Sequence, residues 1–314
     1  DYAPRIWDYW ERNLDPDLFV DHSLEGNVSG RNVLITGASS GIGKATALRL
    51  ADAGAHVILV ARTLEKLEET AAEIELAGGR ASMHTADVSV MEDVDRLGQE
   101  VLEAHGAIDV LINNAGRSIR RSLELSFDRF HDFERTMQLN YFGAIRLIMG
   151  LAPSMLERRS GQVINISSIS ALMPAPRFSA YVASKSALDA WTRAAAVEFS
   201  DRNVRFTTIN MPLVRTPMIA ATEVYNSMPI ISPEEAADMV AEAVIKKPKR
   251  IATRLGISLQ VMNALMPHVT EVLMNTVFRM FGDSAAARGE KKPEEVRVSN
   301  EQVALAALMK GVHF

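Results

Sequence analysis

The segment from Asn32 to Ala53 constrains the fold most strongly, because it joins a buried strand to a helix through a turn rich in glycine. The strand is NVLIT (32–36), the turn is GASSGIG (37–43), and an Ala-rich helix follows. Glycines let backbone N–H groups approach a pyrophosphate that faces the helix N-terminus. The pattern therefore predicts a dinucleotide site. Its candidate ligands are Gly37, Ser39, Ser40, Gly41, Ile42 and Gly43.

β-Favouring runs alternate with helical stretches from this segment to about residue 250. Further strands are expected at His56–Ala61, Ala81–Ala86, Ile108–Ile112, Gln162–Ser167 and Val204–Ile209, with a short one near Ile251. Because helices connect successive strands, the sheet should be parallel and doubly wound, which is a Rossmann-type α/β fold. We expect one domain in three parts: an amino-terminal arm (1–29), the Rossmann domain (30–254) and a helical extension (255–314).

Small and polar residues follow several of these strands. Ligands of doubly wound sheets lie beyond the carboxyl ends of the strands, so a binding site is expected at that edge. The residues predicted to line it are Asp87, Val88, Asn113, Ala115, Gly116 and Ser168.

Arg62 ends the second predicted strand. Folds specific for NAD usually place an acid near this point to bind the ribose hydroxyls. A basic side chain suits a 2′-phosphate instead, so the sequence predicts NADP(H) as cofactor. A solvated residue at the start of a helix remains the alternative interpretation of Arg62.

The stretch from Gly161 to Leu188 carries the candidate chemistry. Tyr181 and Lys185 are four residues apart, so they share one helix face. A Pro-containing loop can fold Ser168 over that face, which brings a hydroxyl, a phenol and an ammonium together. A cation beside a phenol lowers its pKa and suits acid catalysis near neutral pH. A surface helix with solvated Tyr and Lys side chains remains the alternative.

The composition excludes several classes of function. The chain has 314 residues, a formal charge of −5 and no cysteine. It is not typical of nucleic-acid binders, and it can form neither a disulfide nor a Cys-ligated zinc site. We predict no metal site. The absence of thiols fits a reducing compartment, and no signal peptide is visible, so a cytoplasmic location is expected.

Residues 255–282 depart from the alternation, because apolar residues recur there at helical spacing. Pro267 should split or kink this helix. Methionines at 262, 266, 274 and 280 would give a flexible apolar lining. The segment is predicted either to cover a long apolar substrate, with Met262 and Met266 in contact, or to lie on a membrane surface. An ordinary core or dimer helix remains open.

Taken together, the motifs resemble those of short-chain dehydrogenases/reductases: TGASSGIG (36–43), NNAG (113–116), Asn140, Ser168 and YVASK (181–185). The resemblance implies that Tyr181 is the general acid, Lys185 binds the nicotinamide ribose and Ser168 holds the substrate oxygen. It also implies a water-linked proton relay at Asn140, and a homo-oligomer. By the same resemblance, the cofactor contacts would include Pro212, Val214 and Thr216, whereas Leu213 stands where the family often has glycine.

A narrower resemblance covers nearly the whole chain. Segments 113–144, 177–190, 211–220, 232–238 and 246–253 are similar to bacterial fatty acyl-CoA reductases that form aldehydes. This implies NADPH-dependent reduction of long-chain acyl-CoA, which supplies aldehyde for fatty alcohol or wax ester synthesis. In some of these enzymes the domain is the carboxy-terminal part of a longer chain. The WDYWERNLDPDLF leader (7–19) and the missing first Met fit such a fusion.

Three arginines just after the NNAG turn, Arg117, Arg120 and Arg121, are candidates for binding the CoA phosphates. Surface ion pairs with Glu124 or Asp128 are the alternative. Two other functions also stay open at this point. One is a carbonyl or 3-oxoacyl reductase acting on a ketone or aldehyde, and the other is a non-catalytic dinucleotide-binding module.

Overall fold

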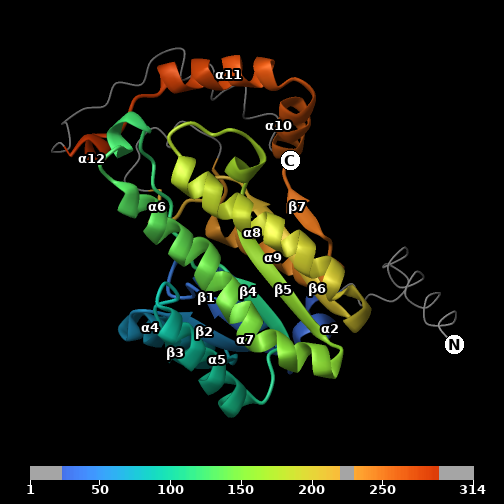
Figure 1. Cartoon of the computed structure of the whole chain (residues 1–314). Coiled ribbons are helices and arrows are strands. Elements are labelled where there is room, and N and C mark those ends of the chain that lie inside the picture. The colour runs from blue at the N-terminus through green and yellow to red at the C-terminus, as the bar shows by residue number, and fades with distance from the viewer. Residues whose placement is uncertain (1–22, 220–229, 290–314) are drawn as a thin grey trace, which may run out of the picture.

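The computed structural model describes residues 23–219 and 230–289 (Figure 1). Seven parallel strands among these residues form one sheet in the order β3-β2-β1-β4-β5-β6-β7. They are β1 Asn32–Thr36, β2 His56–Ala61, β3 Arg80–Thr85, β4 Val110–Asn113, β5 Gly161–Ser168, β6 Val204–Met211 and β7 Arg250–Ala252. The strand order reverses direction at β1, as in a doubly wound sheet, so the predicted α/β class is confirmed.

Helices cover both faces of the sheet. One face carries α2 Leu24–Val28, α3 Gly41–Asp52, α4 Leu64–Leu76 and α9 Pro233–Lys246, and the other carries α5 Met91–His105, α7 Gly143–Arg158 and α8 Ser179–Glu198. Successive side chains of a strand point to opposite faces. Accordingly, Val33 and Ile35 pack in one apolar layer, and Leu34 packs in the other.

A continuous helical stretch runs from Phe130 to Arg158. It consists of α6 Phe130–Met137, a π-helical turn at Gln138–Phe142 and α7. By length and composition alone it could cross a membrane, with a mean hydropathy of 1.2 in its best 18-residue window. However, 44% of that window is buried, because α7 packs on α5 and α6 packs on α8. An apolar composition together with burial against other helices is typical of a helix in the core of the fold.

Capping-box spacing occurs at Ser89 and at Ser232 in the described part of the chain, and the motif forms at Ser232. At the start of α9, Ser232 Oγ accepts from the Glu235 N–H, and the Glu235 carboxylate accepts from the Ser232 N–H. A box at Ser89, which has the same spacing, does not form. The N-cap of α5 is Val90, one residue later, and the Ser89 hydroxyl donates to Asp87 Oδ1 at 2.6 Å.

The extension forms two helices, α10 Arg254–Leu265 and α11 Pro267–Met280, so the predicted break at Pro267 is confirmed. Pro267 is the first residue of α11, where its missing N–H costs no hydrogen bond. In Figure 1, α11 lies across the end of the molecule that also holds the loop into α8. A single turn, α12 Ala285–Arg288, follows. Most of the predicted arm, and residues 290–314, lie outside the described residues.

Arg177, in the loop before α8, ties the end of α11 to the Rossmann domain. Its guanidinium donates to the Phe278 carbonyl at 2.9 Å, lies 4.0 Å from the centre of the Phe278 ring, and pairs with Asp283 at 3.3 Å. Its own carbonyl accepts from the Arg121 N–H at 2.8 Å. Three segments that are distant in sequence therefore meet at one buried arginine.

Candidate active site

A cavity of about 790 Å³ opens at the carboxyl ends of the strands. Its walls come from the glycine turn, the ends of β2 to β6, the start of α8, and the helices α10 and α11. One continuous space thus joins the predicted dinucleotide site to the helical extension. Its size and mixed lining are typical of sites for small molecules and cofactors.

Residues of the glycine turn line one end of this cavity: Gly37, Ser39, Ser40, Gly41 and Ile42. Gly37 and Gly41 have φ of +68° and +54°, a conformation that strains other residues. Gly43 does not line the cavity. A Cβ at Gly43 would lie 2.2 Å from the Gly37 carbonyl oxygen, so this glycine allows helix and turn to pack.

Arg62, Asp87 and Val88 line the cavity beside the turn, as does Lys66, which sequence reasoning missed. An Arg62 guanidinium nitrogen lies 3.7 Å from an Asp87 carboxylate oxygen. Burial favours a higher pKa for Asp87, but hydrogen bonds from Ser89 and the charge of Arg62 lower it overall. Two cations thus stand at the position where the sequence predicts a 2′-phosphate.

Asn113 lies at the predicted edge of the sheet, as the last residue of β4, but it does not line the cavity. Its side chain donates to Asn165 Oδ1 at 2.9 Å, and Asn165 donates in turn to Thr192 Oγ1 at 2.8 Å. Asn114 lines the cavity instead and donates to the carbonyls of Thr36 and Gly37 at 3.0 and 3.3 Å. Side-chain alternation along a strand could have suggested the exchange.

Ser168, Tyr181 and Lys185 come together as predicted, and all three line the cavity. Ser168 ends β5 and shares a hydrogen bond with Tyr181 on α8. Lys185 Nζ donates to the Ile166 carbonyl at 2.7 Å. Ser170, which sequence reasoning missed, donates from its hydroxyl to Ser168 Oγ at 2.9 Å. The site thus holds a hydroxyl, a phenol and an ammonium within one small volume.

Burial controls the protonation of this group. It raises the pKa of Tyr181, while the hydrogen bond from Ser168 acts in the opposite direction. It lowers the pKa of Lys185 to about 8, while the nearby Asp189 carboxylate acts to raise it. The predicted lowering of the Tyr181 pKa by Lys185 is therefore not the dominant effect in this structure. A Tyr that keeps its proton is suited to act as an acid.

Asp189 and Asn210 form a second layer behind the site. Asn210 Nδ2 donates to Asp189 Oδ2 at 3.1 Å and to the Ser168 carbonyl at 3.3 Å. Asp189 is buried one helical turn beyond Lys185. Burial raises the pKa of Asp189, and the positive charges of Lys185 and Arg250 partly offset this effect. Neither residue could be predicted from local patterns, because their partners are distant in the chain.

Asn140 is buried in the π-helical turn and does not line the cavity. Its side chain accepts from the Arg117 N–H at 2.8 Å and donates to the Arg117 carbonyl and to Ser184 Oγ, both at 2.9 Å. It therefore fixes the backbone that follows Gly116. The other predicted cofactor residues, Ala115, Gly116, Pro212, Val214 and Thr216, all line the cavity.

The predicted substrate residues divide into two groups. Arg117 and Arg120 line the cavity. Arg121 does not, because its guanidinium pairs with Asp132 and donates to the Ala287 carbonyl. Neither Glu124 nor Asp128 is the acid partner of Arg121.

The extension covers the cavity, but not through the methionines predicted to do so. Met262 and Met266 are absent from the lining, and Met266, which lies at the joint between α10 and α11, is 48% exposed. The residues of the extension that line the cavity are Leu255, Leu259, Leu273, Met274, Val277 and Phe281. The extension thus lines the cavity, as a cover over a substrate would require, whereas Met262 and Met266 do not line it.

Comparison with known proteins gives concordant matches. The sequence profile described as short chain dehydrogenase matches residues 31–225. A fatty acyl-CoA reductase of Acinetobacter baylyi is 53% identical over 288 residues, which are 92% of this chain and 96% of that protein. A fatty acyl-CoA reductase of Mycobacterium tuberculosis is 44% identical over 83% of this chain and 90% of that protein.

A solved structure gives the same result for the fold. A metagenomic short-chain oxidoreductase in complex with NADP superposes with a TM-score of 0.62 and 32% sequence identity. The match covers 72% of this chain and 96% of that chain. The unmatched part of this chain is therefore larger than the unmatched part of the solved structure.

Proposed function

Because this chain belongs to the short chain dehydrogenase family, we propose that it is an NADPH-dependent fatty acyl-CoA reductase that releases a fatty aldehyde and free CoA. One observation carries the proposal. The cavity that contains Ser168 and Tyr181 continues into an apolar wall formed by α10 and α11. A reactive carbonyl beside Ser168 and Tyr181 would thus have room for its alkyl chain along this apolar wall.

The residues of the turn fit NADP(H). Positive-φ glycines and the start of α3 suit a pyrophosphate, and the pair Arg62 and Lys66 suits a 2′-phosphate. Lys185 and Thr216 line the cavity farther along, where a nicotinamide riboside would lie. NADPH supplies the hydride of the reaction. Two observations support NADPH as the cofactor. One is the set of residues described above, and the other is the NADP bound to the similar solved structure.

Ser168 and Tyr181 hold the thioester oxygen through hydrogen bonds that strengthen as negative charge develops on it. Tyr181 then donates its proton to that oxygen, since burial keeps the phenol protonated. Lys185 anchors the nicotinamide ribose and presents its positive charge to the phenolate that results. Asn140 supports this arrangement through the backbone of Arg117, and we propose that it also holds the relay water.

The tetrahedral product of thioester reduction is a thiohemiacetal, which collapses by expelling the CoA thiol. A thiol has a pKa of roughly 8.5 and leaves far more easily than an alcohol. No covalent cysteine intermediate is required, and the chain contains no cysteine. The aldehyde is therefore formed by non-covalent steps at one carbonyl carbon.

The wall formed by the extension favours a long-chain substrate over a small ketone. Each methylene moved from water to an apolar wall contributes about 0.8 kcal/mol. The lining of α10 and α11 offers leucine, methionine, valine and phenylalanine side chains and no charge. A carbonyl or 3-oxoacyl reductase, the second candidate, would use the same Ser168 and Tyr181 but would not require this wall.

The two candidates differ in whether free CoA appears. The test incubates the protein with NADPH and palmitoyl-CoA and measures free CoA with a thiol reagent. Because the chain has no cysteine, the protein adds no background to this signal. We expect one CoA released for each NADPH oxidised in the first reduction. Oxidation of NADPH by 3-oxoacyl substrates alone, with no CoA released from palmitoyl-CoA, would favour the second candidate.

The proposal also covers the partners of the protein and its location in the cell. Exposed apolar residues of α10 and α11, such as Val261, Leu265, Val269 and Val272, would support contact of 255–282 with a membrane surface. We also propose a homo-oligomer, a cytoplasmic location and a native fusion to an amino-terminal reductase domain. Sedimentation of the purified protein with and without vesicles tests the oligomeric state and the membrane contact, and the mass of the native polypeptide tests the fusion.

A further inference from the structure

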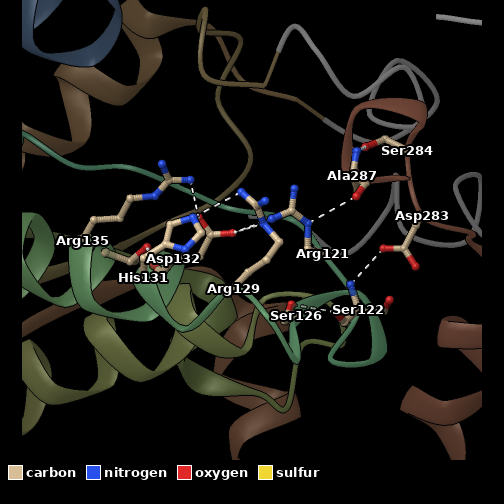
Figure 2. Close-up of polar contacts among 11 residues, drawn as sticks. Arg121, Ser122, Ser126, Arg129, His131, Asp132, Arg135, Asp283, Ser284 and Ala287 are labelled. Atoms are coloured by element: carbon tan, nitrogen blue, oxygen red, sulfur yellow. Dashed lines mark hydrogen bonds and ion pairs between the residues drawn. The ribbon is translucent and has the colours of Figure 1, made fainter. Parts of the chain in front are cut away.

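Asp132, on α6, lies at the centre of a group of cations beside the cavity (Figure 2). It is 2% exposed. Its carboxylate pairs with Arg121, Arg129 and Arg135, and His131 Nε2 lies 3.4 Å away. We call these four side chains and Asp132 the Asp132 cluster. It joins the loop after β4 to α6.

The cluster carries an excess of positive charge. Burial favours a higher pKa for Asp132, but its arginine partners lower it overall, so the carboxylate stays charged. One negative charge therefore faces three guanidinium groups. Each guanidinium has five N–H donors, and a single carboxylate accepts only part of them. The cluster therefore keeps a net positive charge, and a guanidinium of it that also reaches the cavity can offer donors to an anion.

The three arginines differ in position. Arg121 is 14% exposed, and it also donates to the Ala287 carbonyl. Arg129 contacts His131 through its guanidinium and does not line the cavity. Arg135 is 45% exposed and lines the cavity. Of this cluster, Arg135 alone combines a fixed orientation, set by Asp132, with access to the cavity.

Arg117 and Arg120 line the same cavity. Among the described residues of its lining, the sole acid is Asp87, which stands at the opposite, cofactor end beside Arg62. The positive charge of Arg177 is already matched by Asp283. The side of the cavity near the loop after β4 is therefore cationic without a lining carboxylate of its own.

We propose that Arg135, oriented by Asp132 and acting with Arg117 and Arg120, binds a phosphate group of the nucleotide part of the thioester carrier. This inference rests on the proposed function and extends it to the end of the substrate farthest from the acyl chain. The planar guanidinium fork matches phosphate oxygens in a bidentate geometry. Arg135, together with Arg117 and Arg120, thus distinguishes a nucleotide-bearing thioester from a simple one, and contributes to binding and not to the chemical step.

The test compares two thioesters of the same acyl chain, octanoyl-CoA and S-octanoyl-N-acetylcysteamine, which lacks every phosphate. In Arg135→Gln we expect the KM for octanoyl-CoA to rise about 10-fold or more, the loss of one charged hydrogen-bonded contact. We expect no change in kcat, in the KM for NADPH, or in any parameter for the simple thioester. Rising salt should weaken the binding of octanoyl-CoA by the wild-type protein in the same selective way.

Arg129→Gln is the matched control, because Arg129 pairs with the same carboxylate but does not line the cavity. It should leave the KM for octanoyl-CoA within about twofold of the wild-type value. Thermal unfolding of both variants shows whether α6 is intact, and Arg135→Lys provides a variant with the charge retained. An equal KM change for both thioesters, or no change in Arg135→Gln, would overturn the proposal. If the wild-type protein releases no CoA at all, the proposed function has failed instead.

Discussion

The cofactor end of the cavity and its helical cover are built in different ways. At the cofactor end, the backbone itself forms the surface: glycines with positive φ, the start of α3 and the ends of parallel strands. At the cover, side chains of α10 and α11 form it, and the backbone only carries them. A surface made by backbone tolerates almost no change in residue type, whereas a surface made by side chains changes with each substitution. The first suits an invariant cofactor, and the second suits a choice among acyl chains.

The largest effect is expected where the two regions meet. Tyr181→Phe removes the hydroxyl that donates a proton to the substrate oxygen, while it keeps the ring and its packing. We expect kcat to fall by roughly 10²–10⁴-fold. NADPH binding, measured by the change in nucleotide fluorescence, should stay close to that of the wild-type protein. Turnover that survives this change would exclude Tyr181 as the general acid.

A methyl group at the cofactor end should damage the fold. In Gly43→Ala the new Cβ would meet the Gly37 carbonyl oxygen at 2.2 Å, so turn and helix must separate. We expect a loss of about 1–3 kcal/mol in the free energy of unfolding, together with weaker NADPH binding. Chemical denaturation and a nucleotide titration measure the two effects.

Gly98→Ala, on α5, is the control for this change. A Cβ at Gly98 meets nothing within 4 Å, and alanine is the better helix former. We expect this variant to be more stable by about 0.5–1 kcal/mol, with unchanged NADPH binding. If both alanines behave alike, the close contact at Gly43 is not what constrains the turn.

At the cover, substitution should change preference and not stability. Val277 lines the cavity, so Val277→Trp shortens the space for the acyl chain. We expect the ratio of kcat/KM for palmitoyl-CoA to that for octanoyl-CoA to fall by at least about 10-fold. Val272 lies on the same helix but is 69% exposed, so Val272→Trp should leave the ratio unchanged. Similar shifts in both variants would place the acyl chain elsewhere.

The smallest effect concerns pH. Lys185 has a pKa of about 8, and activity that needs its cationic form is lost as the pH rises through that value. Asp189 acts to raise the pKa of Lys185, so Asp189→Asn should lower it further. The basic limb of the kcat profile should therefore move to lower pH, while the amide still accepts the Asn210 hydrogen bond. A limb that stays in place, or moves to higher pH, contradicts this role.

The same contrast explains what could be predicted from the sequence. The strands, the glycine turn and the meeting of Ser168 with Tyr181 and Lys185 follow from local patterns. The structure confirms their positions, although several strand ends differ by one or two residues from the predicted bounds. Met262 and Met266 do not line the cavity. Spacing identifies a helix but neither its rotation about its axis, which decides the side that Met262 faces, nor the joint between α10 and α11 at which Met266 lies. Asn113 ends β4 as predicted, but its side chain donates to Asn165, and its neighbour Asn114 lines the cavity instead.

Other features could not have been found from local patterns at all. The Asp132 cluster joins Arg121 to Asp132 across a loop, and Asn210 meets Asp189 from another strand. Each pair consists of common polar residues with no distinctive spacing. Only the tertiary fold shows that these carboxylates are buried, and burial is what makes their partners important.

The contacts of Arg177 also bear on the order of folding. Its hydrogen bond to the Phe278 carbonyl closes a loop of 101 residues, which includes β6, α9 and β7. Contacts across long loops form late, because the chain entropy lost on closure must first be offset by other structure. We therefore expect α11 to dock after the sheet is complete and to open first in the native state. Amide hydrogens of α11 should exchange through local opening, well before those of β4 and β5.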